Sequence, residues 1–545
     1  MSSRTAVAAL VVVAAMSILP GLGRATLWEP DEPRFAEATR QMFARHDFAT
    51  PYFNGVPRFE KPILIYWLQA AAHGVAANEL AARLPSALAG VGSVLLLFLI
   101  ASRMTTRAAA LIAALAFATM FRFVALARQG LTDVPVLFFI LAALYGFVWA
   151  TVERSARAAW LAWIAVGLGI LTKGPVGLLA VIIWSACALV RRDRSLVSQV
   201  RPIAGPALAL LIAAPWYVLM VAKHGHAFVD FALGHEIVAR VLSDDGFAPD
   251  RGLFYYFKVW PGDAAPWSLL FIAAIVWAAF RWQRLDVSDR RALLFALTWF
   301  LSVFVVFSLS SSKVPHYVLP AYPAAAMVIG IFIDRVARWP NDAAWWRVPM
   351  AIIAVALLAL AALLAWSIDV LMPDAAPLAR WLVPLVFAAG ALGLAASVWR
   401  ARVVPAAAGL AVTLGAAFAV IGAVVIPGAV EAFKPMPRLA HAASPLLQPG
   451  ARIGLLGRYG ASSLIYYSGH NIEWLLDDAA TVVFARRPGA VCVMPEDDYK
   501  RLAPRLPPTM RVIDSAEEFN VRIERLLDRQ RTHGREWVLV AAAAP

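Results

Sequence analysis

The sequence predicts a polytopic α-helical membrane protein that ends in a soluble α/β domain. Hydrophobic residues make up 61% of the 545-residue chain and charged residues only 15%. A soluble domain of this size could not cover its surface with so few polar side chains, and many apolar runs reach the roughly 20 residues that cross a bilayer. Arginine-rich short loops alternate with neutral or acidic ones, as the positive-inside rule expects. The net charge of +14 therefore indicates membrane topology rather than nucleic-acid binding.

The apolar runs give about 13 expected spans. The first run is like a signal peptide, but its end, 19–23, is a poor cleavage site, so we expect a retained span. The arginine-rich loops place the N-terminus in the cytoplasm, and an odd number of spans places the C-terminus outside. The spans are expected near 5–25, 80–102, 107–126, 133–152, 157–172, 175–191, 202–221, 266–282, 291–309, 315–335, 348–369, 378–399 and 404–426.

Two long loops on the outer side interrupt this pattern, at 26–79 and 222–265. In the first loop, apolar residues recur at helical spacing after Pro33 and again after Pro62. Such amphipathic segments predict helices that lie in the membrane interface, where aromatic side chains are favoured. Loops as long as the second are usually functional or mobile. We therefore assign residues 1–429 to a transmembrane domain that carries both loops.

After about residue 430 the chain changes to short strand-like and helix-like segments. Strands are expected at 452–456, 472–476, 490–494 and 537–540, and helices at 462–467 and 497–502. Residues 430–545 are therefore expected to form a soluble α/β domain outside the membrane. The two cysteines cannot form a disulfide framework, because Cys187 falls in an apolar span and Cys492 in this domain.

Five times a charged residue stands just ahead of a proline that opens a predicted helix. Proline suits the first helical position, and the free N–H groups and dipole of a helix start favour an anion. The expected topology places all five starts on the outer face, where they predict a polar site for a phosphorylated substrate. They are Asp31-Glu32-Pro33, Lys61-Pro62, Asp133-Val134-Pro135, Lys173-Gly174-Pro175 and Lys313-Val314-Pro315.

Asp31, Glu32 and Asp133 are the carboxylates of these helix starts. Each has a structural explanation, because an acid just before a helix caps its N-terminus and stabilises its dipole. Asp31 and Asp133, near the same surface, also suit a general base, an electrostatic stabiliser or a metal ligand. The residues alone leave both explanations open.

Lys61, Lys173 and Lys313 are the cations of the helix starts. A lysine at a span end can simply extend its ammonium group to the interface. Alternatively, the ammonium group and the helix N-terminus together bind a phosphate. His316 and Tyr317, which follow Lys313, are further donors to a phosphate oxygen. Positive charge on the outer face runs against the positive-inside bias, which favours the functional explanation.

The second long loop carries further candidate ligands. Its histidines match no strong metal-ligand spacing, so a dedicated metal site is the less favoured explanation. Arg240 and Arg251 are candidate phosphate contacts. The candidate metal ligands of this loop are His224, His226, His235 and Glu236.

Five segments carry a family likeness: Trp28–Glu37, Arg58–Trp67, Leu131–Asp133, Leu171–Pro175 and Ser312–Tyr317. They resemble the bacterial lipid A aminoarabinose transferases, which belong to the protein-O-mannosyltransferase-like glycosyltransferases with a class C fold. The segments cover the membrane part in the family's order, whereas the terminal domain is similar only in placement and size. The Asp-Glu-Pro-Arg and Phe-Glu-Lys-Pro motifs are more specific for the family than for the sugar.

The resemblance implies an enzyme that moves 4-amino-4-deoxy-L-arabinose from undecaprenyl phosphate to a phosphate of lipid A. The active site and the terminal domain would be periplasmic, at the bacterial inner membrane. The cationic sugar would mask an anionic phosphate and so weaken polymyxin and other cationic peptides. A monomer is expected. The implied site consists of Asp31, Asp133 and Glu32 as catalytic carboxylates, of Lys61, Arg58, Lys313, Tyr317, Arg240 and Arg251 on the carrier phosphate, of Glu60, Lys173 and His316 near the substrate, and of Glu60 and His235 for a divalent metal, if one is required.

A phosphate acceptor is already ionised at neutral pH, so Asp31 need not remove a proton from it. Asp31 would instead pair with the sugar ammonium group or stabilise positive charge at the anomeric carbon. Lys61 would neutralise the departing phosphate, and we expect Lys61→Ala to cost far more turnover than Lys173→Ala.

Two other functions stay open from the sequence. A related transferase could glycosylate a protein or another lipid hydroxyl, in which case Asp31 would act as a base. A transporter would need charge at mid-membrane or paired broken helices in repeated halves, and the sequence gives neither sign.

Overall fold

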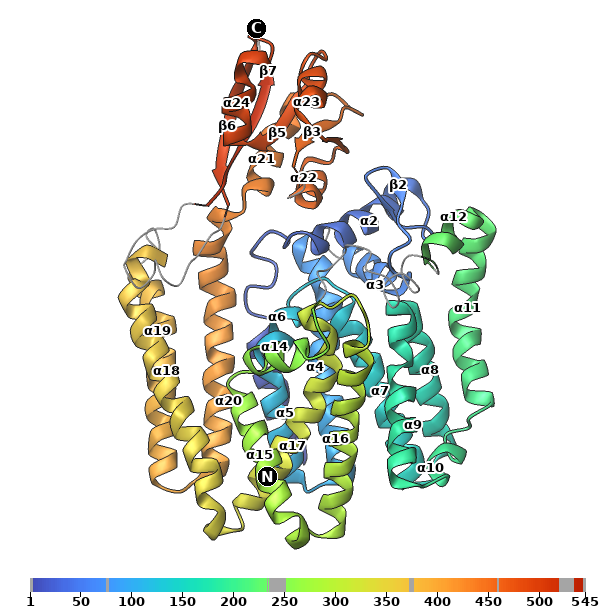
Figure 1. Cartoon of the computed structure of the whole chain (residues 1–545), viewed down its shortest axis with the longest axis vertical. Coiled ribbons are helices and arrows are strands. Elements are labelled where there is room, and N and C mark those ends of the chain that lie inside the picture. The colour runs from blue at the N-terminus through green and yellow to red at the C-terminus, as the bar shows by residue number, and fades with distance from the viewer. Residues whose placement is uncertain are drawn as a thin grey trace.

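The protein is a tall helix bundle with a smaller sheet-containing domain above one end (Figure 1). This computed structural model describes residues 3–74, 78–232, 234, 251–371, 377–457, 460–518 and 534–542. The N-terminus lies at the lower end of the bundle, together with α10 (Ser195–Ser198) and the turn between α19 (Pro377–Trp399) and α20 (Val403–Val420) (Figure 1). The C-terminus lies at the far top. The two termini therefore lie beyond opposite ends of the bundle.

The bundle consists of long apolar helices whose starts are set by polar caps. Asn78, Thr106, Ser155 and Asp286 each accept a hydrogen bond from a backbone N–H of the first turn. The helices are α1 (Ser3–Ile18), α4 (Glu79–Met104), α5 (Arg107–Ala118), α6 (Phe121–Ala127), α7 (Asp133–Val152), α8 (Ala156–Lys173), α9 (Leu179–Arg191), α11 (Ala204–His224), α14 (Tyr255–Asp263), α15 (Trp267–Arg281), α16 (Val287–Ser308), α17 (Tyr322–Val336), α18 (Ala343–Leu371), α19 (Pro377–Trp399) and α20 (Val403–Val420).

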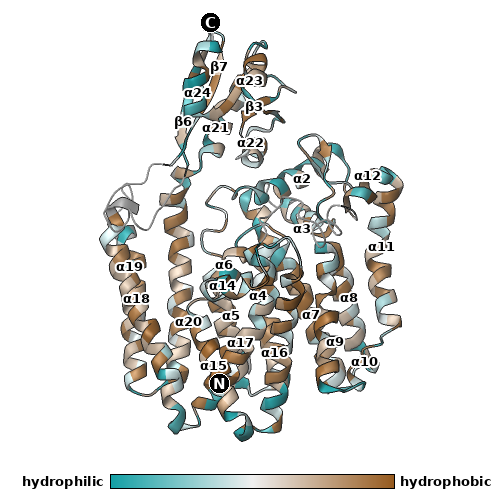
Figure 2. Cartoon of the chain, viewed as in Figure 1, coloured by the Kyte–Doolittle hydropathy of each residue, from teal (hydrophilic) through white to brown (hydrophobic). Residues whose placement is uncertain are grey.

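Hydropathy follows this arrangement: the apolar residues fill the bundle, and polar residues gather at its ends and over the upper domain (Figure 2). Among the described residues, nine helices are long and apolar enough to cross a membrane, or up to eleven if each of two sharply bent pairs is one span. The chain is therefore a polytopic α-helical membrane protein, as predicted. The expected number of 13 spans stays a prediction.

The continuous helical stretch Ala156–Arg191 reverses direction at the 3₁₀ turn η1 (Gly174–Leu178). The ring of Phe147 lies 5.6 Å from the ring of Trp163 and also 5.6 Å from that of Trp184. A straight helix, rising 1.5 Å per residue, would hold those two tryptophans about 31 Å apart. The reversal brings Lys173 and Pro175 to the same end of the bundle as the start of α7.

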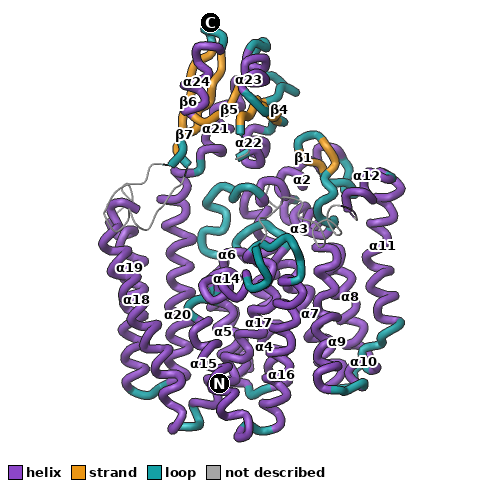
Figure 3. The backbone as a smooth tube through the Cα atoms, in the orientation of Figure 1, coloured by secondary structure: helices purple, strands orange, loops and turns teal. Residues whose placement is uncertain are grey.

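The upper end of the bundle is covered by the first long loop. This loop forms α2 (Asp31–Arg45), a hairpin of β1 (Tyr52–Phe53) and β2 (Val56–Pro57), and α3 (Leu64–His73). The repeated apolar residues of both helices, including Phe35, Met42 and Tyr66, are buried in the bundle core. The predicted amphipathic helices therefore exist, and their apolar faces pack on the protein. The loops that connect the elements of this end gather beneath them (Figure 3).

Three further short elements complete the upper end. They are α12 (His226–Val229), η1 and the 3₁₀ helix η4 (Pro315–Ala321), which follows α16 and runs into α17. The proline-led starts predicted at Asp31, Asp133, Gly174 and Pro315 all begin helical elements, and α3 begins two residues after Pro62. The fixed φ of proline suits these positions, and the missing N–H costs no helical hydrogen bond.

The upper domain is built on a five-stranded mixed sheet in the order β4-β3-β5-β7-β6. Strands β3 and β4 are parallel, as are β3 and β5, whereas β7 is antiparallel to both β5 and β6. Alternating side chains of β5 pack into two separate cores, Val491 and Val493 on one face and Cys492 and Met494 on the other. The strands are β3 (Ile453–Leu456), β4 (Ile472–Leu475), β5 (Val491–Pro495), β6 (Met510–Glu517) and β7 (Glu536–Ala542), and the helices are α21 (Pro435–Ala443), α22 (Ala461–Ser468), α23 (Asp478–Ala485) and α24 (Glu496–Leu502).

The sequence predicted four of these five strands and missed β6. Its segment, Met510–Glu517, carries polar or charged residues at half of its positions, so no apolar run marked it. After α20, the π-helix η6 (Ile421–Val430) and the 3₁₀ helix η7 (Glu431–Phe433) lead into α21. The domain boundary at 429/430 stays a prediction. Both cysteines are buried and unpaired.

Candidate active site

A cavity of about 230 Å³ lies at the upper end of the bundle, where the first long loop meets α7, η1, α11 and η4. Most of its wall is apolar, with Phe59, Trp216 and Phe228 among the lining side chains. Ionisable groups are few and come from four different parts of the chain. They are Glu60, Lys61, Asp133, Lys173 and His316, with Tyr217 and Tyr317 beside them.

Asp133 forms the polar centre of this cavity. Lys173 Nζ lies 2.7 Å from Asp133 Oδ1 and donates a hydrogen bond to it, and His316 Nε2 lies 3.7 Å from the same oxygen. Lys173 Nζ also lies 5.5 Å from the centre of the Tyr317 ring. The side chain of Asp133 is only 10% exposed, so these partners stabilise a carboxylate that has lost most of its water.

Glu60 and Lys61 form a second polar part of the cavity wall, on the loop before α3. Arg58 donates to Glu60 Oε2 at 2.8 Å, and Lys61 Nζ donates to the backbone carbonyl of Glu60 at 2.9 Å. Burial raises the pKa of the Glu60 carboxyl, but the charges of Arg58, Lys61 and Arg34 outweigh it and leave that pKa below its ordinary value. Glu60 is therefore ionised at neutral pH. The charge of Lys61 also acts on Asp133 across the cavity.

Asp31 does not line the cavity but lies close to its polar groups. Its side chain is 50% exposed, and its ion-pair partner is Arg34, at 3.8 Å. The charge of Asp31 acts on both Arg58 and His316. Asp31 is thus an accessible carboxylate near the polar cluster, whereas Asp133 is a buried one within it.

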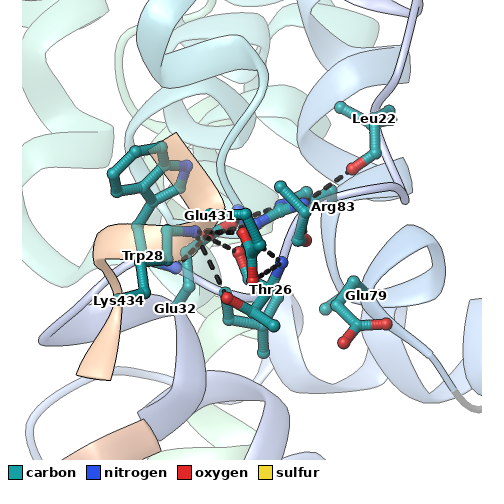
Figure 4. Close-up of polar contacts among 12 residues, drawn as sticks. Leu22, Thr26, Trp28, Glu32, Glu79, Arg83, Glu431 and Lys434 are labelled. Carbon is teal, nitrogen blue, oxygen red and sulfur yellow. Dashed lines mark hydrogen bonds and ion pairs between the residues drawn. The ribbon is translucent and has the colours of Figure 1, made fainter. Parts of the chain in front are cut away.

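Glu32, the neighbour of Asp31, has a very different environment. Its side chain is 1% exposed and meets Arg83 in a bidentate ion pair, with distances of 3.0 and 2.9 Å. It also accepts hydrogen bonds from the backbone N–H groups of Trp28, at 2.7 Å, and Gly130, at 2.6 Å. Arg83 in turn donates to the carbonyls of Leu22, Ala25 and Thr26. We call this group the Glu32–Arg83 clasp (Figure 4).

The clasp joins segments that are far apart in the sequence. It fixes the chain between α1 and α2 to α4 and to the turn before α7. Every donor of the Arg83 guanidinium and both oxygens of Glu32 have partners. The geometry therefore favours a structural role for Glu32 over the predicted catalytic one.

Of the remaining predicted residues, those that the structure describes are not among the residues that line the cavity. Lys313 is 5% exposed and donates to the carbonyl of Ser310, a cavity residue, at 2.7 Å. Arg251 contacts the hydroxyl of Tyr255. His224 contacts Thr50, and its ring lies 5.1 Å from that of Phe59. His235, Glu236 and Arg240 lie outside the described residues. Within the described ranges, no group of three or more His, Cys, Asp or Glu side chains could hold a metal ion.

Two arginines near the site were not predicted. Arg83 holds the clasp, and Arg122 forms a bidentate ion pair with Asp263, with distances of 3.0 and 2.6 Å, while its charge also acts on His316. Both stand near the outer ends of expected spans. An arginine there runs against the positive-inside bias, which is the sequence signal that would have marked them.

A second, larger cavity of about 760 Å³ lies among α15, α18, α19 and α20. Its wall is almost wholly apolar, and Arg380 is the one charged residue among those that line it in the described part of the chain. Phe121, next to Arg122, and Gly262, next to Asp263, also line it. The Arg122–Asp263 pair is therefore adjacent in sequence to two residues of this second cavity.

Comparison with known proteins gives the site a family. The model of the dolichyl-phosphate-mannose-protein mannosyltransferase family matches residues 2–229, which include Asp31, Lys61, Asp133 and Lys173. An uncharacterized protein of Aquifex aeolicus is 32% identical over 56% of this chain and 68% of that protein.

Several similar proteins are undecaprenyl phosphate-alpha-4-amino-4-deoxy-L-arabinose arabinosyl transferases. The one from Pseudomonas aeruginosa (strain LESB58) is 29% identical over 73% of this chain and 72% of that protein. Transferase 1 of Pseudomonas fluorescens is 31% identical over 62% of this chain and 61% of that protein. The chain thus spans about three fifths of the length of some of the curated relatives it matches.

Solved structures share the whole architecture. ArnT from Cupriavidus metallidurans, bound to undecaprenyl phosphate, has a TM-score of 0.74 and 24% identity over 99% of this chain and 98% of that chain. The oligosaccharyltransferase AglB of Archaeoglobus fulgidus has a TM-score of 0.51 and 14% identity over 90% of this chain and 69% of that chain. These matches confirm the fold. The resemblance seen in the sequence motifs is confirmed by the curated relatives and by the family model: residues 2–229 match the model of the dolichyl-phosphate-mannose-protein mannosyltransferase family.

Proposed function

We propose that this protein transfers 4-amino-4-deoxy-L-arabinose from undecaprenyl phosphate to a phosphate of lipid A. The observation that carries this proposal is the cavity in which Asp133, Lys173 and His316 face Glu60 and Lys61 within an apolar wall. Cations there suit a phosphate, carboxylates suit an amino sugar, and the wall of Phe59, Trp216 and Phe228 suits a polyprenyl tail. The relatives named as undecaprenyl phosphate-aminoarabinose arabinosyl transferases support the same donor.

The reaction exchanges one phosphate ester for another at the anomeric carbon. A lipid A phosphate oxygen forms a bond to that carbon, and the bond from the carbon to the carrier phosphate oxygen breaks. The electron pair of the broken bond leaves with the carrier, which departs as undecaprenyl phosphate with one additional negative charge. No proton need be removed from the acceptor, because its phosphate is already ionised.

Lys61 is assigned to the carrier phosphate. Its ammonium group lines the cavity next to Glu60, and it neutralises the charge that builds up as the bond to the sugar breaks. Arg58 orients this part of the cavity wall by holding Glu60. Glu60, which stays ionised, is a suitable partner for the ammonium group of the sugar.

Asp31 and Asp133 are assigned different tasks. The half-exposed Asp31 lies near the polar cluster and stabilises the positive charge that develops at the anomeric carbon. The buried Asp133 holds Lys173 and His316 in place as donors toward a phosphate oxygen. This division follows from their exposure and their partners.

The lipid substrates also account for the second cavity. Its apolar wall and volume of about 760 Å³ suit acyl chains, and Arg380, which lines it, suits a phosphate group. The upper end of the bundle, the upper domain and both cavities would face the periplasm of the bacterial inner membrane, and modified lipid A would bind polymyxin less tightly.

The test is the mass spectrum of lipid A from cells that lack the protein, that carry the wild type, or that carry Asp31→Asn. We expect an aminoarabinose adduct only with the wild type, together with a higher polymyxin tolerance. Equal spectra in all three strains would refute the proposal. An adduct of the same sugar on a protein or on a lipid hydroxyl would instead identify the related hydroxyl-directed transferase.

A further inference from the structure

Residues 19–30 connect α1 to α2, which begins at Asp31. This segment is held from two sides. We call it the α1–α2 strap. On its lower side the Glu32–Arg83 clasp binds it to the bundle. On its upper side the contacts come from residues 431–467, at the start of the upper domain. The position of Asp31 therefore depends on both parts of the molecule.

The first upper contacts surround Thr26. Its backbone N–H donates to both oxygens of Glu431, at 3.2 Å each, and its carbonyl accepts a hydrogen bond from Lys434 Nζ at 2.7 Å (Figure 4). Lys434 Nζ also lies 3.9 Å from the centre of the Trp28 ring. This pair ties the strap to the linker that follows η6.

The second set of contacts comes from α22. The backbone N–H of Leu27 donates to the hydroxyl of Tyr467 at 2.7 Å, and this hydroxyl donates to Glu79 at 3.0 Å. The backbone N–H of Ser463 donates a short hydrogen bond to Glu29 Oε1. One element of the upper domain thus contacts the strap two residues before Asp31.

The third contact reaches Asp31 through its own ion-pair partner. Arg34 Nε donates to the hydroxyl of Ser462 at 3.1 Å, while Arg34 Nη1 lies 3.8 Å from Asp31 Oδ1. Ser462 and Ser463 are each 1% exposed, so neither bond competes freely with water. Glu29 and Arg34 bracket Asp31 in the sequence, and both are held by adjacent residues of α22.

We propose that the upper domain positions Asp31 for the transfer reaction through α22, with Glu29 and Ser462 as its positioning residues. This proposal rests on the role assigned to Asp31 above. Neither residue touches the substrate. Glu29 fixes the backbone before Asp31, and Ser462 fixes the guanidinium group of Arg34 beside it. Together they set the direction in which the Asp31 carboxylate points.

The Glu29 side chain acts through its hydrogen-bond acceptor oxygen rather than through a negative charge. Burial raises the pKa of Glu29, and the hydrogen bonds from Ser463 and the charge of Arg34 only partly offset this rise. A glutamine at this position keeps the acceptor oxygen and removes the cost of a buried charge. Glu29→Gln is therefore the conservative variant, and Glu29→Ala is the disruptive one.

The experiment measures kcat and KM of the full-length protein in detergent, with a polyprenyl-phosphate-linked aminoarabinose donor and lipid A. Glu29→Ala is expected to lower kcat about 10–100-fold, because a small displacement of a catalytic group is costly, while KM for the donor stays near that of the wild type. Glu29→Gln is expected to stay within roughly three-fold of the wild type. Ser462→Ala is expected to lie between them.

The matched control is Glu473→Ala, which removes a carboxylate from the same domain, where it pairs with Arg487 far from the strap in sequence. It should leave kcat unchanged. Equal kcat in Glu29→Ala and the wild type, or equal losses in Glu29→Ala and Glu29→Gln, would overturn the proposal. Equal kcat in Glu29→Ala and the wild type would show that the contact between Glu29 and Ser463 does not affect turnover. Equal losses in Glu29→Ala and Glu29→Gln would show that the charge of Glu29 itself is needed.

Hydrogen exchange of the backbone amides of residues 26–32 provides a readout that needs no activity. These amides are expected to exchange faster in Glu29→Ala than in Glu29→Gln, Glu473→Ala or the wild type. Unchanged exchange in Glu29→Ala would overturn the positioning role. Absence of transfer by the wild type would instead refute the proposed function and leave the exchange result to decide whether α22 holds the strap.

Discussion

The Glu32–Arg83 clasp and the cavity around Asp133 use the same kinds of residue in opposite ways. In the clasp, Glu32 is 1% exposed and meets four hydrogen-bond donors, and Arg83 has a partner for each of its own. In the cavity, Asp133 meets one lysine closely and one histidine at 3.7 Å. In the clasp, all of these polar groups are bound to one another. In the cavity, the ionisable groups line an empty volume.

Adjacent residues in the sequence show the same difference. Asp31 and Glu32 both precede Pro33 at the start of α2, yet Asp31 is half exposed and Glu32 is buried. Successive residues at a helix start point in directions about 100° apart, so Asp31 is left half exposed while Glu32 faces the core. A charge that is fully satisfied stabilises the fold, and one that is left accessible is available for substrate.

The largest expected effect is on the clasp. Arg83→Ala leaves Glu32 buried without a cation, which costs about 3–5 kcal/mol of folding free energy. We expect a much lower unfolding temperature in detergent and little folded protein. A variant as stable as the wild type would contradict the structural role of the clasp.

The next effect separates Asp31 from its neighbour. Asp31→Asn is expected to lower turnover about 10²–10³-fold, since it removes charge stabilisation in the transition state. Its unfolding temperature should stay that of the wild type, because the side chain has one loose ion pair and is half exposed. Unfolding of this variant, or normal turnover, would remove the distinction between the two carboxylates.

A smaller effect concerns the two lysines of the cavity. The sequence motifs predict that Lys61→Ala costs far more turnover than Lys173→Ala, but the hydrogen bond from Lys173 to Asp133 gives a reason for comparable losses. In a double-mutant cycle, Lys173→Ala and Asp133→Asn should show a coupling free energy of about 0.5–3 kcal/mol. The cycle is measured on turnover and on thermal stability. If the effects of the two substitutions simply add, Lys173 and Asp133 act independently of each other.

The smallest effect is expected at an exposed ion pair of the upper domain. Arg487 contacts Glu473 at 2.8 and 2.9 Å, and its side chain is 51% exposed. Arg487→Ala should cost less than about 1 kcal/mol and leave turnover unchanged, because water screens such pairs. A large loss of stability in a thermal unfolding assay would contradict this comparison. It would mean that an exposed ion pair stabilises the protein as much as the buried Glu32–Arg83 pair does.

The sequence was sufficient for the fold class because hydrophobicity and helix-start signals are local. Apolar runs mark the helices of the bundle, and proline-led starts mark α2, α7, η1 and η4. Four strands of the upper domain were predicted for the same reason. Strand β6 was missed because half of its residues are polar or charged, and its place depends on pairing with β7.

The candidate site was predicted only in part, because its geometry depends on long-range contacts. Four residues named from the motifs, Lys61, Asp133, Lys173 and His316, line one cavity. The motifs could not separate Asp31 from Glu32, since both residues satisfy the same capping rule. The motifs do not include Arg83 or Ser463, and the partners of these residues, about 50 and more than 430 residues away in the sequence, could not be read from them. The roles of these residues in catalysis stay predictions.

The most direct measurement is transfer of aminoarabinose by the purified protein from a polyprenyl phosphate donor onto lipid A, followed by mass spectrometry. The wild type is expected to give the adduct, and Asp31→Asn is expected to give almost none while it unfolds at the same temperature. No adduct from the folded wild type, or equal yields from both proteins, would contradict the assignment of this cavity as the transfer site.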